Sequence, residues 1–116
     1  MKQHTTPEQT VKLIQLGFKK PKSSVECELP KGDWRIGAVG LRKAYSIGEL
    51  IEMLPESLKN SYNPPLVIEC NEKWRVYYGV QADYSLEWLI WLEEERNELI
   101  DALYNMIVKL KEEGMI

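Results

Sequence analysis

The most constraining feature of the sequence is a strongly apolar stretch that continues directly into consecutive charged residues. Leu86 to Leu92 contains Trp88 and Trp91, and Glu93 to Arg96 follows without a spacer. On a helix at 100° per residue, these apolar side chains point in every direction, and the charges then occupy every side of one turn. Because burying charge is costly, such a helix must project into solvent at that turn or break into two pieces.

The residues around this stretch predict a long C-terminal helix. The pattern is helical from Ser85 to Glu113, with Gly114 as its stop, and Leu99 to Leu110 carries one apolar face. The part before Glu93 is apolar all round and needs more cover than one amphipathic contact gives. We therefore expect a protein interface or a helix in the core of the same domain. The interface candidates are Trp88, Ile90, Trp91 and Leu92.

The rest of the chain predicts two helices and two hairpins. The first predicted helix is capped by Thr6 with Gln9 and stops at Gly17, and the second is capped by Ser46 with Glu49 and ends at Pro55. The first predicted hairpin joins strands Val25–Leu29 and Trp34–Val39 through a turn at residues 30–33. The second joins strands Leu66–Cys70 and Trp74–Val80.

These elements predict an α+β fold in one domain, residues 1–116, with a four-stranded antiparallel sheet covered by helices. We divide the chain into a leading helix (residues 1–22) and two ββα units (residues 23–60 and 61–116). The units show an internal echo that aligns Leu50-Ile51 with Leu89-Ile90. A rival alignment matches Leu50-Ile51 to Leu99-Ile100 instead, so duplication and convergent use of local signals both stay open.

The charge is unevenly distributed along the 116 residues. Residues 1–43 hold nine Lys or Arg against four Asp or Glu, whereas residues 44–116 hold six against fourteen, within a net charge of −3. This asymmetry favours self-complementary charge, within one molecule or between two copies, over a dedicated nucleic-acid surface. The apolar runs are too short for a transmembrane helix, and the N-terminus has no apolar signal region. We therefore expect a cytoplasmic protein that does not enter membranes.

Few residues have the types and spacing that catalysis or metal binding requires. The two cysteines, Cys27 and Cys70, are far apart in sequence and flanked by glutamates, which predicts two buried reduced thiols rather than a metal site or a disulfide. The sequence contains no phosphate-binding glycine loop and no nucleophile elbow. We therefore predict no catalytic residues, no metal, no cofactor and no small-molecule ligand.

Aromatic residues beside cations suggest a second hypothesis, nucleic-acid binding. An exposed strand face that carries arginine and tyrosine can stack bases and hold phosphates. The alternative is that the arginines pair with Glu26 and Glu69 on a solvated outer face. The nucleic-acid candidates are Arg35, Lys73, Arg75 and Tyr77.

Three segments, Thr6 to Phe18, Tyr45 to Ile51 and Leu99 to Met106, resemble small uncharacterised proteins of prophages and mobile elements in Bacteroides-like gut bacteria. The resemblance implies a bacterial or phage cytosolic origin and assigns no activity or site residues. The sequence thus predicts a non-enzymatic accessory domain that binds protein and self-associates as a homodimer. The alternative is a nucleic-acid-associated regulatory protein of a phage or mobile element.

Overall fold

The computed structural model describes residues 1–28, 39–81 and 88–116. In this part of the chain, three helices and two antiparallel sheets form an α+β fold, as predicted. The elements are α1 (Pro7–Gln15), β1 (Ser23–Glu28), β2 (Val39–Ala44), α2 (Ile47–Met53), β3 (Leu66–Cys70), β4 (Trp74–Gln81), β5 (Trp88–Arg96) and α3 (Leu99–Glu112).

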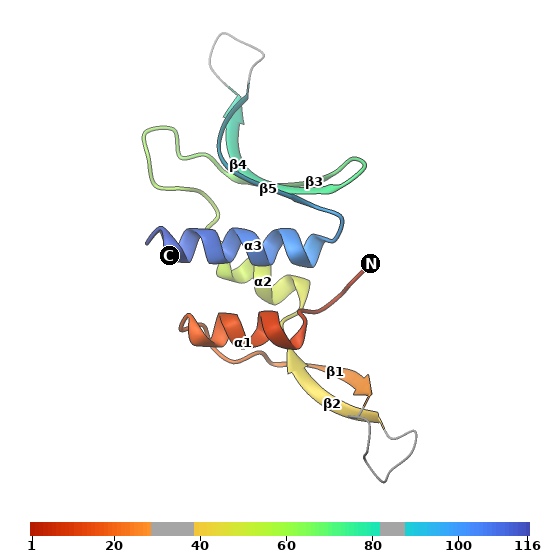
Figure 1. The fold of residues 1–116 in the computed structure, drawn as a ribbon. Coiled ribbons are helices and arrows are strands. Elements are labelled where there is room, and N and C mark those ends of the chain that lie inside the picture. The colour runs from red at the N-terminus through yellow and green to blue at the C-terminus, as the bar shows by residue number, and fades with distance from the viewer. Residues whose placement is uncertain (29–38, 82–87) are drawn as a thin grey trace.

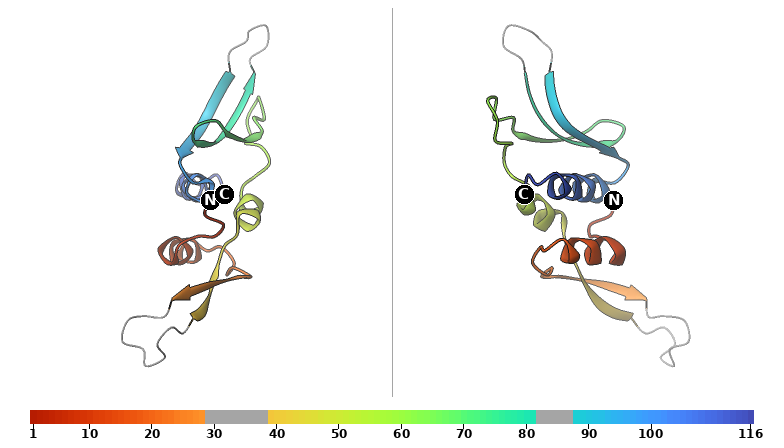
Figure 2. Two further views of the ribbon diagram at one scale, coloured as in Figure 1. Left: turned by 90° about the vertical axis from the view of Figure 1, so that its right-hand side faces the viewer. Right: turned by 60° about the vertical axis from the view of Figure 1, so that its left-hand side comes forward.

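The molecule is elongated, with extents of 66 × 31 × 18 Å. Its radius of gyration is 17.2 Å, against about 13 Å for a compact chain of this length. The sheet β3–β4–β5 lies at one end, α3 and α2 form the middle, and α1 and the β1–β2 hairpin lie at the other end (Figures 1 and 2). Figure 1 shows that β4 and β5 extend beyond α3 at their upper ends.

Local sequence signals set the ends of the helices as predicted. The Thr6 hydroxyl accepts from the Gln9 amide at 3.1 Å, and the Gln9 side chain accepts from the Thr6 amide at 3.0 Å. Gly17 ends α1 at a φ of +100°, and the next amide, that of Phe18, donates to the Leu13 carbonyl. Ser46 caps α2 with Glu49 in the same reciprocal way.

The core lies where α3 packs between the three-stranded sheet and α2. Leu103, Met106 and Ile107 of α3 are fully buried, together with Val76 and Tyr78 of β4. The Tyr78 hydroxyl donates to the Pro55 carbonyl at 2.7 Å, so this polar group remains satisfied where the ring is buried. None of the helices in the described residues is long and apolar enough to cross a membrane.

The prediction of one four-stranded sheet is wrong. The β1–β2 hairpin forms a sheet of its own, because the helices lie between it and the other strands (Figure 1). The second hairpin instead gains β5 as a third strand. The predicted strand Trp34–Val39 falls largely on residues 29–38, outside the described part, and the observed strand β2 begins at Val39.

The prediction of a helix from Ser85 is also wrong between Trp88 and Arg96, which form β5, while Leu99 to Glu112 is helical as predicted. A strand solves the charge problem because its side chains alternate between two faces. Glu93 and Glu95 lie opposite Tyr77 and Arg75 on the outer face, away from α3. Glu94 alone turns towards α3, where its carboxylate contacts the Lys109 ammonium at 2.7 Å.

The first alignment of the two ββα units does not pair a helix with a helix. Leu50 and Ile51 lie in α2, whereas Leu89 and Ile90 lie in β5. The rival alignment pairs residues that are helical in both copies, since Leu99 and Ile100 begin α3.

Candidate functional site

β5 is an edge strand of the three-stranded sheet. Among the described residues it pairs with β4 on one side and with no strand on the other. The pairing shifts by one residue along β5, since Ile90 lies opposite Gly79 and Leu92 opposite Tyr78. Trp91 is therefore the extra residue of a β-bulge, which divides β5 into two halves.

The bulge decides which way the two tryptophans face. Before it, Trp88 and Ile90 lie opposite Gln81 and Gly79 on the outer face. After it, Leu92 lies opposite the buried Tyr78 on the inner face, towards α3. Trp91 contacts the loop on the inner side, so the two tryptophans occupy different faces of the sheet.

The half of β5 before the bulge carries exposed apolar side chains. The exposed fraction is 53% for Trp88 and about 37% for Ile90 and Trp91. Leu89 is exposed to a similar extent, whereas Leu92 is partly buried and packs against the core. Three of the four predicted interface residues are therefore accessible.

The Trp88 ring meets a buried tyrosine on the outer face. Its centroid lies 6.4 Å from that of Tyr77, edge to face. The Arg75 guanidinium lies over the Tyr77 ring, 4.4 Å from its centroid. A Cβ on Gly79 would lie 3.0–3.2 Å from this ring and from the Leu89 carbonyl oxygen, so the absence of a side chain lets the ring pack closely over the strand.

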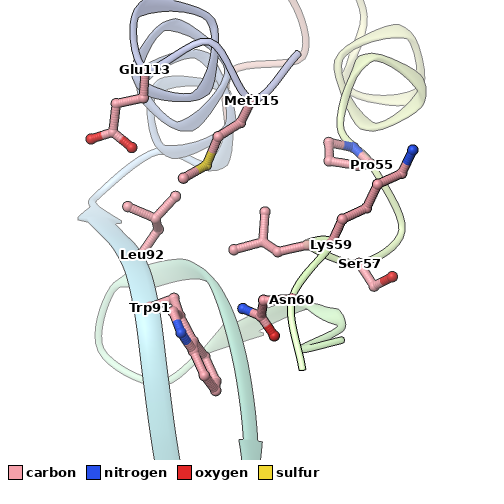
Figure 3. Close-up of a pocket in the computed structure, with 9 residues that line it drawn as sticks. Pro55, Ser57, Lys59, Asn60, Trp91, Leu92, Glu113 and Met115 are labelled. Atoms are coloured by element: carbon pink, nitrogen blue, oxygen red, sulfur yellow. The ribbon is translucent and has the colours of Figure 1, made fainter. Parts of the chain in front are cut away.

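Trp91 lines a cavity of about 560 Å³ between β5, the loop after α2 and the end of α3. Figure 3 shows Trp91 beside Asn60, and Met115 pointing towards Leu92. The Tyr62 ring lies 5.5 Å from the Trp91 ring and is itself largely exposed. The lining residues are Pro55, Ser57, Leu58, Lys59, Asn60, Trp91, Leu92, Glu113 and Met115.

Arg75, a nucleic-acid candidate, is held by two carboxylates. Its guanidinium donates to Glu93 at 2.6 and 3.1 Å and to Glu69 at 2.9 Å. These hydrogen bonds and the opposite charge raise the pKa of Arg75 and lower that of Glu93. The predicted pairing of Arg75 with Glu69 is confirmed.

The other nucleic-acid candidates have little free basic surface. Tyr77 is 4% exposed. Lys73 lines a hollow whose other charged members are Arg75 and four glutamates. Arg35 lies outside the described residues.

Cys70 is exposed at the end of β3, contrary to the prediction of a buried thiol. It ends an edge strand beside the hairpin turn. The side chain of Cys27 lies outside the described part of the structure. Within the described residues, no group of three or more His, Cys, Asp or Glu side chains is placed to hold a metal.

Comparisons with protein-family models, with curated proteins and with solved structures found no match for this chain. The site therefore stands on its own geometry. Sequence reasoning found the exposed apolar residues but missed the bulge, the edge position and the Tyr62 contact. Gly79 was the available signal, since a glycine inside a strand often marks a bulge or a close approach.

Proposed function

We propose that this chain is a non-enzymatic cytoplasmic accessory protein that binds protein, and that its partner is a second copy of itself. The observation that supports this proposal is the half of β5 from Trp88 to Ile90, which is apolar, exposed and at the edge of a sheet. An edge strand offers backbone donors and acceptors to another strand, and its side chains supply the apolar contact. Pairing of two copies across this edge would satisfy the backbone groups and bury the apolar side chains.

The alternation of side chains suits a second copy in antiparallel register about Leu89. In that register Trp88 of one copy lies opposite Ile90 of the other, and both belong to the outer face. Cross-strand pairs of an aromatic and a β-branched residue each contribute about 0.2–1 kcal/mol. The pairing would join two three-stranded sheets into one.

The charges after the bulge favour this register over others. About Leu89, the two copies of Glu93 are eight residues apart along the ladder, roughly 26 Å. A register centred on Glu93 or Glu94 would place like carboxylates directly opposite each other, which is destabilising. The bulge and the charges thus disfavour strand pairing along β5 after Trp91 and leave Trp88 to Ile90 available for it.

The alternative, nucleic-acid binding through Arg75 and Tyr77, has less support. Arg75 is engaged by Glu69 and Glu93, and Tyr77 is buried beneath Arg75 and beside Trp88. A phosphate at this position would have to displace two carboxylates from one guanidinium.

Light scattering coupled to size exclusion tests the proposal. At tens of micromolar we expect twice the 13.5 kDa chain mass for the wild type and the single-chain mass for Ile90→Lys. The double variant Trp88→Ala/Trp91→Ala should also be monomeric. Val11→Lys is the matched control, since Val11 is 53% exposed but lies on α1, far from β5. A wild type that stays monomeric, or an Ile90→Lys variant that stays dimeric, contradicts the proposal.

A further inference from the structure

The segment between α1 and β1, Lys19-Lys20-Pro21-Lys22, is named here the lysine strap. All three lysines are exposed, while Pro21 is buried. The strap is therefore attached to the protein through its proline and presents its ammonium groups to solvent.

Three hydrogen bonds fix the backbone of the strap. The Tyr45 hydroxyl donates to the Lys19 carbonyl at 2.5 Å. The Lys22 amide donates to the Glu49 carboxylate, and the Lys43 ammonium donates to the Lys22 carbonyl, both at 3.1 Å. Lys43 therefore joins the strap as a fourth cation, and little backbone entropy is left to lose when the strap binds a ligand.

The carboxylates beside the strap leave it basic. Glu49 and Glu52 line the same hollow, of about 350 Å³, as the three lysines. Burial raises the pKa of Glu49, but hydrogen bonds from Ser23, Lys22 and Ser46 outweigh it and lower the pKa to about 2. Glu49 is therefore ionised, but the three strap lysines and Lys43 outnumber Glu49 and Glu52. Among the described side chains, no ion pair joins a carboxylate to a strap lysine.

We propose that the lysine strap, with Lys43, binds the phosphate backbone of nucleic acid without reading its bases. Lysine ammonium groups neutralise phosphates and release condensed counterions, which supplies sequence-independent affinity. The strap and Lys43 lie within the basic residues 1–43. They are separate from the strand face of Arg75 and Tyr77, which belongs to the sheet on the far side of α3 and α2 (Figure 1). They are also independent of self-association through β5.

The acidic end of a second copy is a weaker candidate for the same surface. Three of its carboxylates already have cationic partners, since Glu69 and Glu93 contact Arg75, and Glu94 contacts Lys109. Nucleic-acid phosphates have no such internal partners. At moderate salt, charges more than about 10 Å away are screened, so the acidic sheet does not prevent a nucleic acid from approaching the strap.

Fluorescence anisotropy with a labelled oligonucleotide, single-stranded and duplex, tests the proposal. Three to four phosphate contacts predict a log–log salt slope of about −3 on the duplex, or roughly 60-fold weaker binding between about 50 mM and 200 mM salt. We expect Lys19→Ser/Lys20→Ser to reduce the steepness of this slope by about 2. Lys59→Ser/Lys73→Ser removes the same charge from exposed positions elsewhere and should leave the slope unchanged.

Three outcomes would overturn the proposal. They are no anisotropy change at low salt, equal weakening in both double variants, and low-salt self-association that the strap variant abolishes in the absence of nucleic acid. The last outcome would assign the strap to the carboxylates of another copy. The same titration with Ile90→Lys separates the two proposals, since a monomeric chain retains its strap.

Discussion

In β5 a charged residue is buried in one half of the strand, and a tryptophan is exposed in the other. Glu94, after the bulge, is 8% exposed, whereas Trp88, before it, is 53% exposed. The two residues belong to one strand and lie six positions apart. What separates them is α3, which packs against the half after the bulge, whereas the upper ends of β4 and β5 extend beyond α3 (Figure 1).

This contrast shows that cover by another element, rather than hydrophobicity, decides what is buried in this sheet. Glu94 is tolerated under α3 because Lys109 and Arg96 contact its carboxylate at 2.7 and 3.0 Å. Beyond α3, β4 and β5 continue as a two-stranded ribbon, and such ribbons are marginally stable on their own. The ribbon therefore gains from external cover, which self-association would supply.

The largest effect should separate a core residue of α3 from an exposed residue of β5. We expect Ile107→Ala to lower the free energy of unfolding by about 2–5 kcal/mol, because Ile107 is fully buried and its loss leaves a cavity. Ile90→Ala should cost under about 0.5 kcal/mol in the monomer. Urea unfolding at low protein concentration measures both. Equal losses would mean that the exposed half of β5 is as well covered as the core.

The bulge itself can be tested at Gly79. Gly79→Ala should destabilise the protein by about 1–3 kcal/mol, because the new Cβ would lie 3.0 Å from the Leu89 carbonyl oxygen and against the Tyr77 ring. Gly48→Ala is the control in α2, where the new Cβ would meet its nearest atom, the Ser46 hydroxyl, at 3.9 Å. That change should be neutral or slightly stabilising. A harmless Gly79→Ala would show that the ring does not lie over the strand as described.

The buried charge offers a smaller effect. Lys109→Met should cost about 1–2 kcal/mol, because it removes one of two cations from the Glu94 carboxylate. Lys111→Met, two residues along α3, removes the same charge without a described ion pair and should cost less. Thermal unfolding of both variants checks the difference. Indistinguishable melting temperatures would mean that Arg96 alone is enough to stabilise the buried Glu94 carboxylate.

The smallest effect concerns the outer face after the bulge. The Arg75 hydrogen bonds hold the pKa of Glu93 below its ordinary value of 4.5, so ionised Glu93 stabilises the fold above that pH. Glu93→Gln should cost under about 1 kcal/mol at neutral pH, because the pair is partly exposed. The difference from wild type should disappear as the pH falls through the lowered pKa. Urea unfolding at neutral and acidic pH measures the difference in stability, with Glu95→Gln as the control. A difference that persists in acid would show that the ion pair with Arg75 is not its cause.

Much of the fold follows from short-range signals. The caps at Thr6 and Ser46 and the stops at Gly17 and Gly114 act within one turn of a helix, so the sequence identifies them directly. The hairpin of β3 and β4 is equally local, because a three-residue connection leaves few other pairings. The prediction failed where two patterns competed, since Trp88 to Leu92 is apolar at the period of a helix and at that of a strand.

The candidate site was predicted in part. Trp88, Ile90 and Trp91 were singled out for their apolar surroundings, and the structure exposes them. Their assignment to a helix was wrong, because the bulge and the pairing with β4 are long-range features that periodicity does not encode. The lysine strap was not among the predicted sites, because its fixed backbone depends on Tyr45 and Glu49, more than twenty residues away in sequence.

The sequence by itself determined the helix ends, the second hairpin, the amphipathic face of α3 and the uneven distribution of charge. The tertiary structure decided that Trp88 to Arg96 pairs with β4, that Glu94 is buried with Lys109, and that the two hairpins lie in separate sheets at opposite ends. The physical reason is range. Caps and turns are satisfied by neighbours in the chain, whereas a strand edge is stabilised or left open by elements that lie far away in sequence.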